Sequence, residues 1–298
     1  MISKVYIIGN GFDKYHGLPS SYSDFRIWLE TNNPDLLKDL TEVWDNRADM
    51  LWSDFEQALG NLDFYNFIHR YKDYNIKKRL TEAQIFYKEH PELPPNLYFH
   101  PLQEKLRPLV KSIQLAFQSW ITDLNSTLSN IKPKLALDKS ASYITFNYTD
   151  TLESVYGIDL LNILHIHGRA SNGDNLIFGH RKTSHQIEYE IEQMHLGASW
   201  RDINDIALEL SALWKNVDYN LFTVTPAFKL LENVNEINIY GYSFNNIDSE
   251  YMNELWERTY KNKPHWNISI HSDNDKERVI QFLSQHIIPN ERYELITL

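Results

Sequence analysis

The feature of this sequence that most constrains its fold is a series of short apolar runs with the composition of buried β-strands. Several of them lack the polar alternation of a half-exposed strand, which is typical of a parallel sheet covered on both faces. Helical patterns separate the runs, as expected for an α/β protein. The sequence therefore predicts an α/β fold built on a Rossmann-like parallel sheet. The runs are Lys4–Ile8, Ser142–Phe146, Leu161–His165, Glu236–Tyr240, Asn267–His271 and Tyr293–Leu298.

The long interval between the first two runs has mostly helical periodicity. The proline-rich stretch EHPELPPNLYFHP interrupts it, and no helix is expected to cross that stretch. We predict one α/β domain, residues 1–298, with a large helical insertion or cap over residues 20–133. Ser21 and Asp24 have the spacing of a capping box, and a further helical stretch is predicted from Gln186 to Asn233. Apolar stripes support the helices of the insertion: Leu102, Leu106, Leu109, Ile113, Phe117, Trp120, Leu124 and Leu128, and before them Leu51, Phe55, Leu59, Leu62 and Ile68.

Composition narrows the classes of function. The net charge of -11, from 29 basic and 40 acidic residues, disfavours non-specific binding to nucleic acid. It is compatible with a small phosphorylated ligand, because a few backbone N–H groups can hold one. Cysteine is absent, which excludes disulfides and thiolate metal sites. No apolar run has the length of a membrane span or signal peptide, so we expect a soluble, cytoplasmic protein without a membrane partner.

The first run ends in the glycine-containing sequence IIGNGFD. Gly9 and Gly11 allow the backbone to approach a ligand closely, and a helix that follows can present its N–H groups to phosphate. The dinucleotide fingerprint has a third glycine where this chain has Lys14, so the match is partial. A tight turn at the end of a strand explains the glycines equally well. Asp13 is a candidate for orienting a ribose or a water, or for capping the next turn.

A second candidate stretch is YITFNYTDTLE, in which Asn147 follows a buried-type strand. In open α/β sheets the carboxyl ends of the strands face the ligand crevice. An amide at this position can hold a water or a carboxamide, since it offers both a donor and an acceptor. The alternative is a helix N-cap, for which Asn147, Thr149 and Asp150 all qualify.

The third stretch, LNILHIHGRA, places two histidines at the end of a strand. His165 and His167 lie on the same face if the strand continues through both. Histidine is the side chain best suited to proton transfer near neutral pH. Three interpretations remain open: a base at the strand end, a pair of metal ligands, or one structural histidine beside a functional one. A metal site would draw its further ligands from His180, His185 and Asp174.

The fourth stretch, EINIYGYSFNNIDSEYM, ends a buried strand at Gly241. A glycine and the hydroxyl of Ser243 at a strand exit suit a phosphate or ribose contact. Asp248 is either a further ligand contact or the N-cap of the helix that follows. If the sheet is parallel, all four exits lie at one edge and form one composite pocket.

Taken in order, IIGNGFD, WSDFEQAL, FNYTDTLE, HIHG, FGH and YGYSFNNID resemble the motifs of the AbiH family of bacterial phage abortive-infection proteins. That family is in turn similar to sirtuin-like NAD-binding domains of bacterial defence proteins. The resemblance implies that an Asn at a strand end and a His in a His-Gly pair carry the chemistry beside a dinucleotide. The matching positions are Gly9 and Gly11 in the first loop, Asn147, His167, Ser243 and the acidic Asp248.

The resemblance implies an antiphage protein that binds NAD as a substrate and hydrolyses its nicotinamide–ribose bond. Asn147 and His167 are then catalytic, with Asn147 holding water or the carboxamide and His167 accepting a proton. No metal is expected, and without cysteine the zinc module of the sirtuin deacetylases cannot form. Two alternatives stay open: an NAD- or ADP-ribose-binding sensor without catalysis, and a metal-dependent hydrolase or nuclease. Expected partners are a second copy of the chain or a defence-system protein, and a phage trigger. The predicted dinucleotide contacts are Gly9, Asn10, Gly11, Asp13, His165, Gly241, Ser243 and Asp248, with Arg169 and Arg181 available for phosphate.

Overall fold

The computed structural model describes residues 2–44, 51–52, 54–64, 67, 85, 88–91, 103–194 and 200–298. The chain forms two compact units, each assembled from separate segments. We call them the sheet unit, Met1–Asp24, Gln118–Ile177 and Asn216–Leu298, and the helical unit, Phe25–Phe117 and Phe178–Lys215. The sequence assigned residues 20–133 to an insertion, whereas the helical unit also takes in the later segment Phe178–Lys215.

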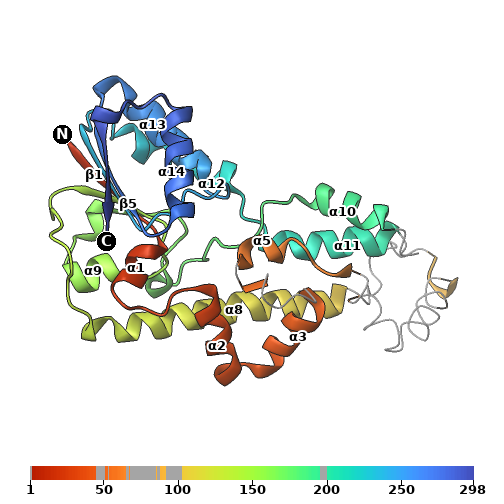
Figure 1. Cartoon of the computed structure of the whole chain (residues 1–298). Coiled ribbons are helices and arrows are strands. Elements are labelled where there is room, and N and C mark those ends of the chain that lie inside the picture. Colours follow the sequence, from red (N-terminus) through yellow and green to blue (C-terminus); the bar gives the residue numbers. More distant parts are fainter. Residues whose placement is uncertain are drawn as a thin grey trace. The chain divides into compact units, whose positions relative to one another are not determined.

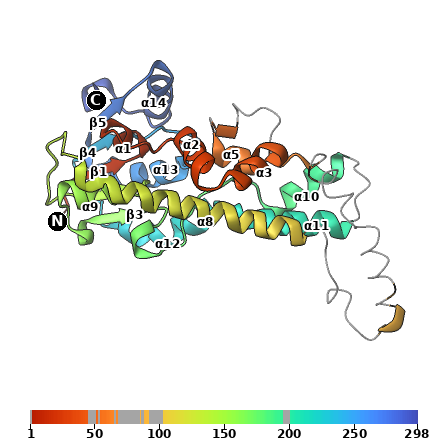
Figure 2. The ribbon, with the colours of Figure 1, turned by 90° about the horizontal axis from the view of Figure 1, so that it is seen from below.

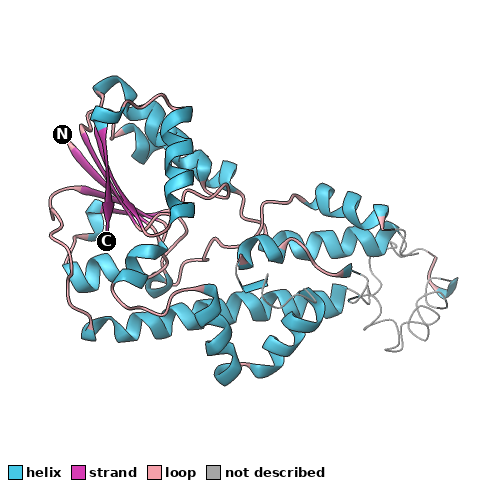
Figure 3. Cartoon of the chain, viewed as in Figure 1, coloured by secondary structure: helices cyan, strands magenta, loops and turns pink. Residues whose placement is uncertain are grey.

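The sheet unit is built on six parallel strands in the order β3-β2-β1-β4-β5-β6. This is the order of a doubly wound dinucleotide-binding fold, in which the direction of winding reverses between β1 and β4. Figure 3 shows the strands in magenta with helices around them. The predicted α/β class with a Rossmann-like parallel sheet is therefore confirmed. The strands are β1 (Lys4–Ile8), β2 (Ser142–Thr145), β3 (Ile163–His165), β4 (Glu236–Tyr240), β5 (His265–Ile270) and β6 (Tyr293–Thr297).

The strand boundaries follow the apolar runs closely, with one informative exception. The run expected from Leu161 forms a strand only from Ile163. The side chain of Asp159 accepts a hydrogen bond from the Leu161 N–H and holds a 3₁₀ turn over Leu160–Asn162. A local side-chain bond to the backbone has thus replaced the first residues of the strand.

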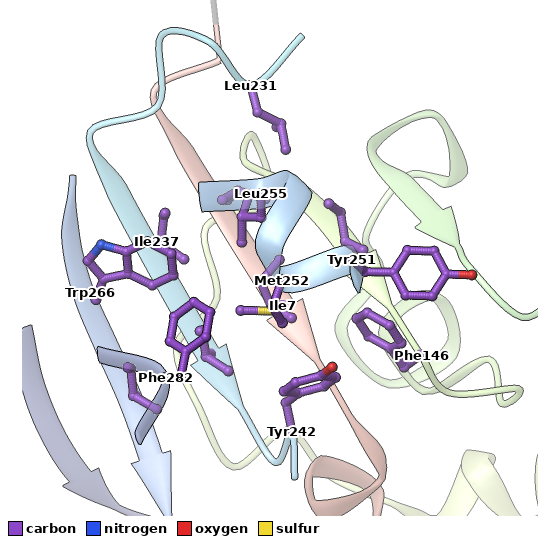
Figure 4. Packing of buried hydrophobic residues seen from close by; sticks show 14 of the residues in the cluster. Ile7, Phe146, Leu231, Ile237, Tyr242, Tyr251, Met252, Leu255, Trp266 and Phe282 are labelled. Carbon is purple, nitrogen blue, oxygen red and sulfur yellow. The ribbon is translucent and has the colours of Figure 1, made fainter. Parts of the chain in front are cut away.

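Both faces of the sheet are buried, which explains why the runs are apolar without alternation. Along β1, Val5 and Ile7 belong to one hydrophobic cluster and Tyr6 and Ile8 to the other. Figure 1 shows the helices that cover the sheet, and Figure 4 shows the first cluster under α13, where Met252 and Leu255 lie over the strands. The helices of this unit are α1 (Asn10–Tyr15), α9 (Thr151–Tyr156), α12 (Val217–Lys229), α13 (Ser249–Thr259) and α14 (Asp273–Gln285).

The helical unit contains the predicted amphipathic helices. The long stripe runs along α8 and ends at Leu128 in the 3₁₀ turn that follows it; its members from Leu106 onward are all buried, and those from Trp120 onward belong to the sheet unit. Of the shorter stripe, Leu51, Phe55, Leu59 and Leu62 are buried, while Ile68 lies outside the described residues. The same holds for most of the proline-rich break. In Figures 1 and 2, α10 lies beside α11. The helices are α2 (Tyr22–Asn32) and α8 (Gln103–Thr127), each shared with the sheet unit, and α3 (Pro34–Trp44), α5 (Phe55–Leu59), α10 (Ser184–Gln193) and α11 (Trp200–Leu210).

The start of α2 follows its local sequence signal. The Ser21 N–H donates to Asp24 Oδ2 at 2.9 Å and the Asp24 N–H donates to Ser21 Oγ at 3.2 Å, so the capping box at the start of α2 is confirmed. Among the residues that the structure describes, no helix combines the length and apolar character that a membrane span requires.

Candidate functional site

The glycines of the first and fourth stretches pack against each other where β1 and β4 end. The Gly11 N–H donates to the Gly241 carbonyl oxygen at 2.9 Å, and the Gly9 N–H donates to the Tyr240 oxygen at 3.0 Å. A Cβ on Gly241 would lie 2.0 Å from the Phe12 nitrogen, and φ there is +66°. The tight-turn interpretation therefore accounts for these glycines. Contact between this loop and a nucleotide stays a prediction. The Gly11 N–H already donates to a backbone oxygen and is not available to a phosphate in this structure.

Asn10 is exposed and closes the segment that follows α1. Its Nδ2 donates to the Ser20 carbonyl oxygen at 2.8 Å, and Ser20 Oγ donates to Asn10 Oδ1 at 2.6 Å. Both ends of the amide are thus used within the loop, and its predicted contact with a dinucleotide stays a prediction.

Asp13 is a buried carboxylate at the junction of α1 and α9, with only 1% of its surface exposed. Thr149 Oγ1 donates to Asp13 Oδ2 at 2.6 Å, and Thr151 Oγ1 donates to Asp13 Oδ1 at 2.7 Å. Burial raises the pKa of Asp13 to about 6, although the two hydroxyl donors act in the opposite direction. A carboxyl group tuned in this way can exchange a proton near neutral pH.

Asn147 lies beside this carboxylate and interacts with it, which lowers the pKa of Asp13, but no hydrogen bond of standard geometry joins the two side chains. It is 5% exposed, and neither Oδ1 nor Nδ2 has a hydrogen-bond partner within the described part of the chain. The N-cap position of α9 is occupied by Asp150, so the N-cap interpretation of Asn147 is wrong. A buried amide with both ends unpaired is costly and indicates a group or water that completes it.

His167 and Asp248 form a buried pair at the same edge of the sheet. His167 Nε2 lies 3.2 Å from Asp248 Oδ1, and Nδ1 lies 3.2 Å from the Phe146 carbonyl oxygen. Both oxygens are acceptors, so the ring satisfies both only when it carries two protons or when the Asp248 carboxyl carries one. Asp248 occupies the N-cap position of α13, but its side chain makes no capping bond there. Its carboxylate contacts His167 instead.

His165 faces a different partner from His167. The strand ends at His165, so the condition under which the two histidines would share one strand face is not met. His165 Nε2 lies 2.7 Å from Glu153 Oε1 on α9, and Arg169 Nε donates to Asp150 Oδ1 at 2.7 Å beside them. His165 Nδ1 and Glu153 Oε2 are buried without a hydrogen-bond partner among the described residues. Together these groups form a second polar cluster next to the Asp13 site.

The candidate metal ligands are divided between the two units, with His165, His167 and Asp174 in the sheet unit and the other two histidines in the helical unit. His180 belongs to the helical unit, where Nε2 contacts the Leu210 carbonyl oxygen at 3.1 Å and the Lys182 N–H donates to Nδ1. His185 is exposed beside Glu188, and Asp174 accepts from the Arg169 N–H at 3.0 Å. The described ranges contain no group of three His, Asp or Glu side chains placed to hold a metal ion.

The motifs WSDFEQAL and FGH meet inside the helical unit. Trp52 stacks on Phe55 with ring centroids 5.3 Å apart, and Gly60 packs against His180, whose Cβ would lie 2.7 Å from a Cβ on the glycine. Lys215 Nζ lies 3.0 Å from Glu56 Oε2 in a buried ion pair. These contacts show a role in packing for both motifs. Arg181 lies in the same unit, while Ser243 is exposed in the loop after β4 of the sheet unit.

Sequence reasoning missed the threonines and Glu153 as members of the site. Thr149 was weighed only as a cap, and Thr151 and Glu153 were not singled out, although all three fall within the TDTLE segment after β2. A run of hydroxyl and acidic residues directly after a buried strand was the available signal.

The four strand exits all fall within a match to a family model described as bacteriophage abortive infection AbiH, which covers residues 5–270. The chain belongs to the AbiH family. A search of curated proteins and a search of solved structures found no significant match. The AbiH assignment thus supports a role in abortive infection, while the resemblance to sirtuin-like NAD-binding domains stays a prediction.

Proposed function

We propose that this AbiH protein binds NAD at the carboxyl ends of β1 to β4 and hydrolyses its nicotinamide–ribose bond. The observation that carries the proposal is Asn147, whose buried amide makes no side-chain hydrogen bond of standard geometry within the described residues. An amide of this kind is complementary to a second carboxamide, because each offers one donor and one acceptor. Nicotinamide carries such a group. The reversal of winding between β1 and β4 is where dinucleotides bind in sheets of this order.

The neighbouring carboxylate suits the chemistry of this bond. Water adds to the ribose carbon as the bond to the nicotinamide nitrogen breaks; the electron pair leaves with nicotinamide, and ADP-ribose and a proton are the other products. The transition state resembles an oxocarbenium ion, so a fixed negative charge nearby lowers the barrier. Asp13 provides one at neutral pH, because its pKa of about 6 leaves it mostly ionised.

His167 accepts the proton in this proposal, but its present contacts impose a condition. Both ring nitrogens face oxygen acceptors, so a ribose hydroxyl or water has to replace Asp248 at Nε2 before the ring can act as a base. Asp248 then changes from the partner of the resting histidine to a contact of the ligand. Restraint of the activity through assembly, a defence-system partner or a phage trigger belongs to the same proposal.

The test is release of nicotinamide from NAD by the purified chain, followed by chromatography. Asn147→Ala and His167→Ala are expected to lower turnover by about 10²-fold or more. Asn130→Ala, at an exposed position of the sheet unit, is the matched control and is expected to retain full activity. Turnover that survives both site substitutions in folded protein contradicts the proposal. An inactive wild-type chain is assayed again in extracts of phage-infected cells.

A sensor that binds NAD or ADP-ribose without turnover is the second candidate. The full engagement of the His167 nitrogens favours it, because both already contact oxygen atoms of the protein. Binding of NAD measured by calorimetry, abolished in Asn147→Ala and unaccompanied by nicotinamide release with or without infected-cell extract, identifies the sensor. Binding with release identifies the enzyme.

A further inference from the structure

A cavity of about 150 Å³ lies among the β4–α13 loop, which also carries Gly241, Ser243 and Asp248, and helices α13 and α14 of the sheet unit. None of the residues assigned above to NAD lines it. Its walls are formed by Tyr242, Phe244, Asn245, Asn246, Ser249, Met252, Asn253, Arg278, Gln281, Phe282 and Gln285.

The size and walls of this cavity suit one aromatic ring. Cavities of roughly 150 Å³ admit benzene, whereas sites for drug-sized ligands span roughly 300–1,000 Å³. Phe244 lies between the other two aromatic walls, with its ring centroid 5.1 Å from that of Tyr242 and 5.2 Å from that of Phe282. Figure 4 shows Tyr242, Met252 and Phe282 coming from the loop, α13 and α14 in turn. The cavity is therefore too small for a dinucleotide and large enough for a single planar ring.

The polar groups at the cavity include N–H donors that the hydrogen bonds of the described residues leave available, beside the amide groups of Asn246, Gln281 and Gln285, which offer both donors and acceptors. Asn245 Oδ1 accepts from the Ile247 N–H at 3.2 Å, which leaves Nδ2 to donate elsewhere. Asn253 Oδ1 lies 3.0 Å from His286 Nε2, so the Nδ2 of Asn253 is also able to donate to another group. Arg278 Nη2 binds Asp275 at 2.8 Å, while its Nε is buried and lacks an acceptor in the described structure. A ligand that carries acceptor oxygens would complete these donors.

The loop that forms one wall also has an unusual backbone. Phe244 has φ of +50°, a left-handed conformation that bulky side chains rarely adopt. Such strain concentrates in ligand-binding and switching segments. Asp248, the partner of His167, lies in this same loop.

Two residues of the cavity hold Asp248 in place. Tyr242 Oη donates to the Asp248 carbonyl oxygen at 3.0 Å, and the Asp248 N–H points to Asn245 Oδ1 at 3.4 Å. Asp248 Oδ1 in turn contacts His167 Nε2. A molecule bound against Tyr242 and Asn245 would therefore change the position of the Asp248 carboxylate, which contacts His167.

We propose that this cavity binds a pyrimidine base of a nucleoside or nucleotide, and that its occupancy shifts the contact between Asp248 and His167. One planar ring fits the volume, aromatic walls suit its faces, and its carbonyl oxygens match the N–H donors. Binding is independent of NAD chemistry, whereas control of catalysis through His167 rests on the proposed function.

Saturation-transfer NMR with uridine and cytidine tests the binding. Gln281→Trp fills the cavity from an exposed position of α14 and is expected to weaken binding at least about tenfold. Ser284→Trp, exposed on the same helix but outside the cavity, is the matched control and is expected to bind as the wild type does. Asn147→Ala is also expected to bind normally, which separates this site from the NAD site.

Absence of binding by both nucleosides, or equal binding by Gln281→Trp, overturns the proposal. Loss of binding in Asn147→Ala instead places the nucleoside at the strand exits and overturns it as well. The coupling is read from the imidazole resonances of His167, assigned with His167→Gln. These resonances are expected to shift when uridine or cytidine binds the wild type and to stay unchanged in Gln281→Trp. If the nucleoside binds and the resonances do not shift, the coupling between the cavity and His167 is refuted. Neither readout requires NAD turnover, so failure here is distinct from failure of the proposed function.

Discussion

Replacing Asn147 with leucine is expected to stabilise the protein while abolishing its function. The buried amide has two polar atoms without partners among the described residues, which is a cost that the folded chain bears before any ligand binds. Leucine has nearly the same shape and no polar atoms, so it removes this cost and adds apolar burial. A residue retained for ligand binding and not for stability should behave in this way.

The magnitude follows from the two unpaired atoms. An unsatisfied buried polar group costs about 1–3 kcal/mol, and the nearby Asp13 carboxylate offsets part of this for Asn147. We therefore expect Asn147→Leu to raise the free energy of unfolding by about 1–3 kcal/mol. Asn220 is the matched control: it is equally buried, but its Nδ2 donates to the Ile166 carbonyl oxygen and to Tyr251 Oη, each at 2.8 Å. Asn220→Leu is expected to lower the free energy of unfolding by about 1–3 kcal/mol.

Urea unfolding of the wild type and both variants, followed by circular dichroism, measures the two changes. The midpoint for Asn147→Leu is expected above that of the wild type and the midpoint for Asn220→Leu below it. A loss of more than about 1 kcal/mol in Asn147→Leu would show that the amide serves the folded state as Asn220 does. The argument from Asn147 to a ligand would then fail.

Further substitutions test the acid, the glycine contact and the helical unit. Burial raises the pKa of Asp13 from 3.8 to about 6, so the folded state holds this proton more tightly than the unfolded state does. The free energy of unfolding therefore falls by about 3 kcal/mol through this group as pH rises from about 4 to 6. Asp13→Asn should lose this pH dependence in urea unfolding, and an unchanged pH profile would contradict the pKa shift. Gly241→Ala should lower the free energy of unfolding by about 2–5 kcal/mol, because its Cβ would clash with the Phe12 nitrogen and its φ is left-handed. Gly173 has a similar φ of +72°, but no heavy atom of the described structure lies within 4 Å of its Cβ position, so Gly173→Ala should cost only about 1–2 kcal/mol. Equal losses in the two variants would refute the close-contact argument. Lys215→Met leaves the buried Glu56 carboxylate without that ion pair and should cost about 3–5 kcal/mol, while a neutral effect on thermal unfolding would show that the pair is dispensable.

The strands were predictable because their signal is local. Each apolar run reports burial on both faces of a parallel sheet, and β1 and β4 match the predicted Lys4–Ile8 and Glu236–Tyr240 residue for residue. The capping box at Ser21 was predictable for the same reason, since its two partners lie three residues apart. Where a local competitor intervened, as Asp159 does before β3, the strand was predicted too long.

The partners within the candidate site were not predictable in this way. Asp13 binds Thr149 and Thr151, which lie 136 and 138 residues away along the chain. His167 contacts Asp248, 81 residues away, whereas His165 contacts Glu153. Motif spacing placed Asn147 at a strand exit, but only its unpaired amide distinguishes a ligand position from a cap. A hydrogen bond between two strand exits requires its donor and acceptor to lie within about 3.5 Å of each other. A local sequence pattern does not predict such distances between segments that are far apart in the chain.

By itself the sequence determined the class of fold, the edge of the sheet at which polar residues gather, and the family to which the chain belongs. Only the tertiary structure decided that the opening glycines serve close backbone contact, that Asp13 is buried with its pKa near 6, and that the two histidines have separate partners. The physical reason is that periodicity along a chain reports how much of each residue is buried. The chemistry of a site depends on which groups, brought from distant segments, are left paired or unpaired there.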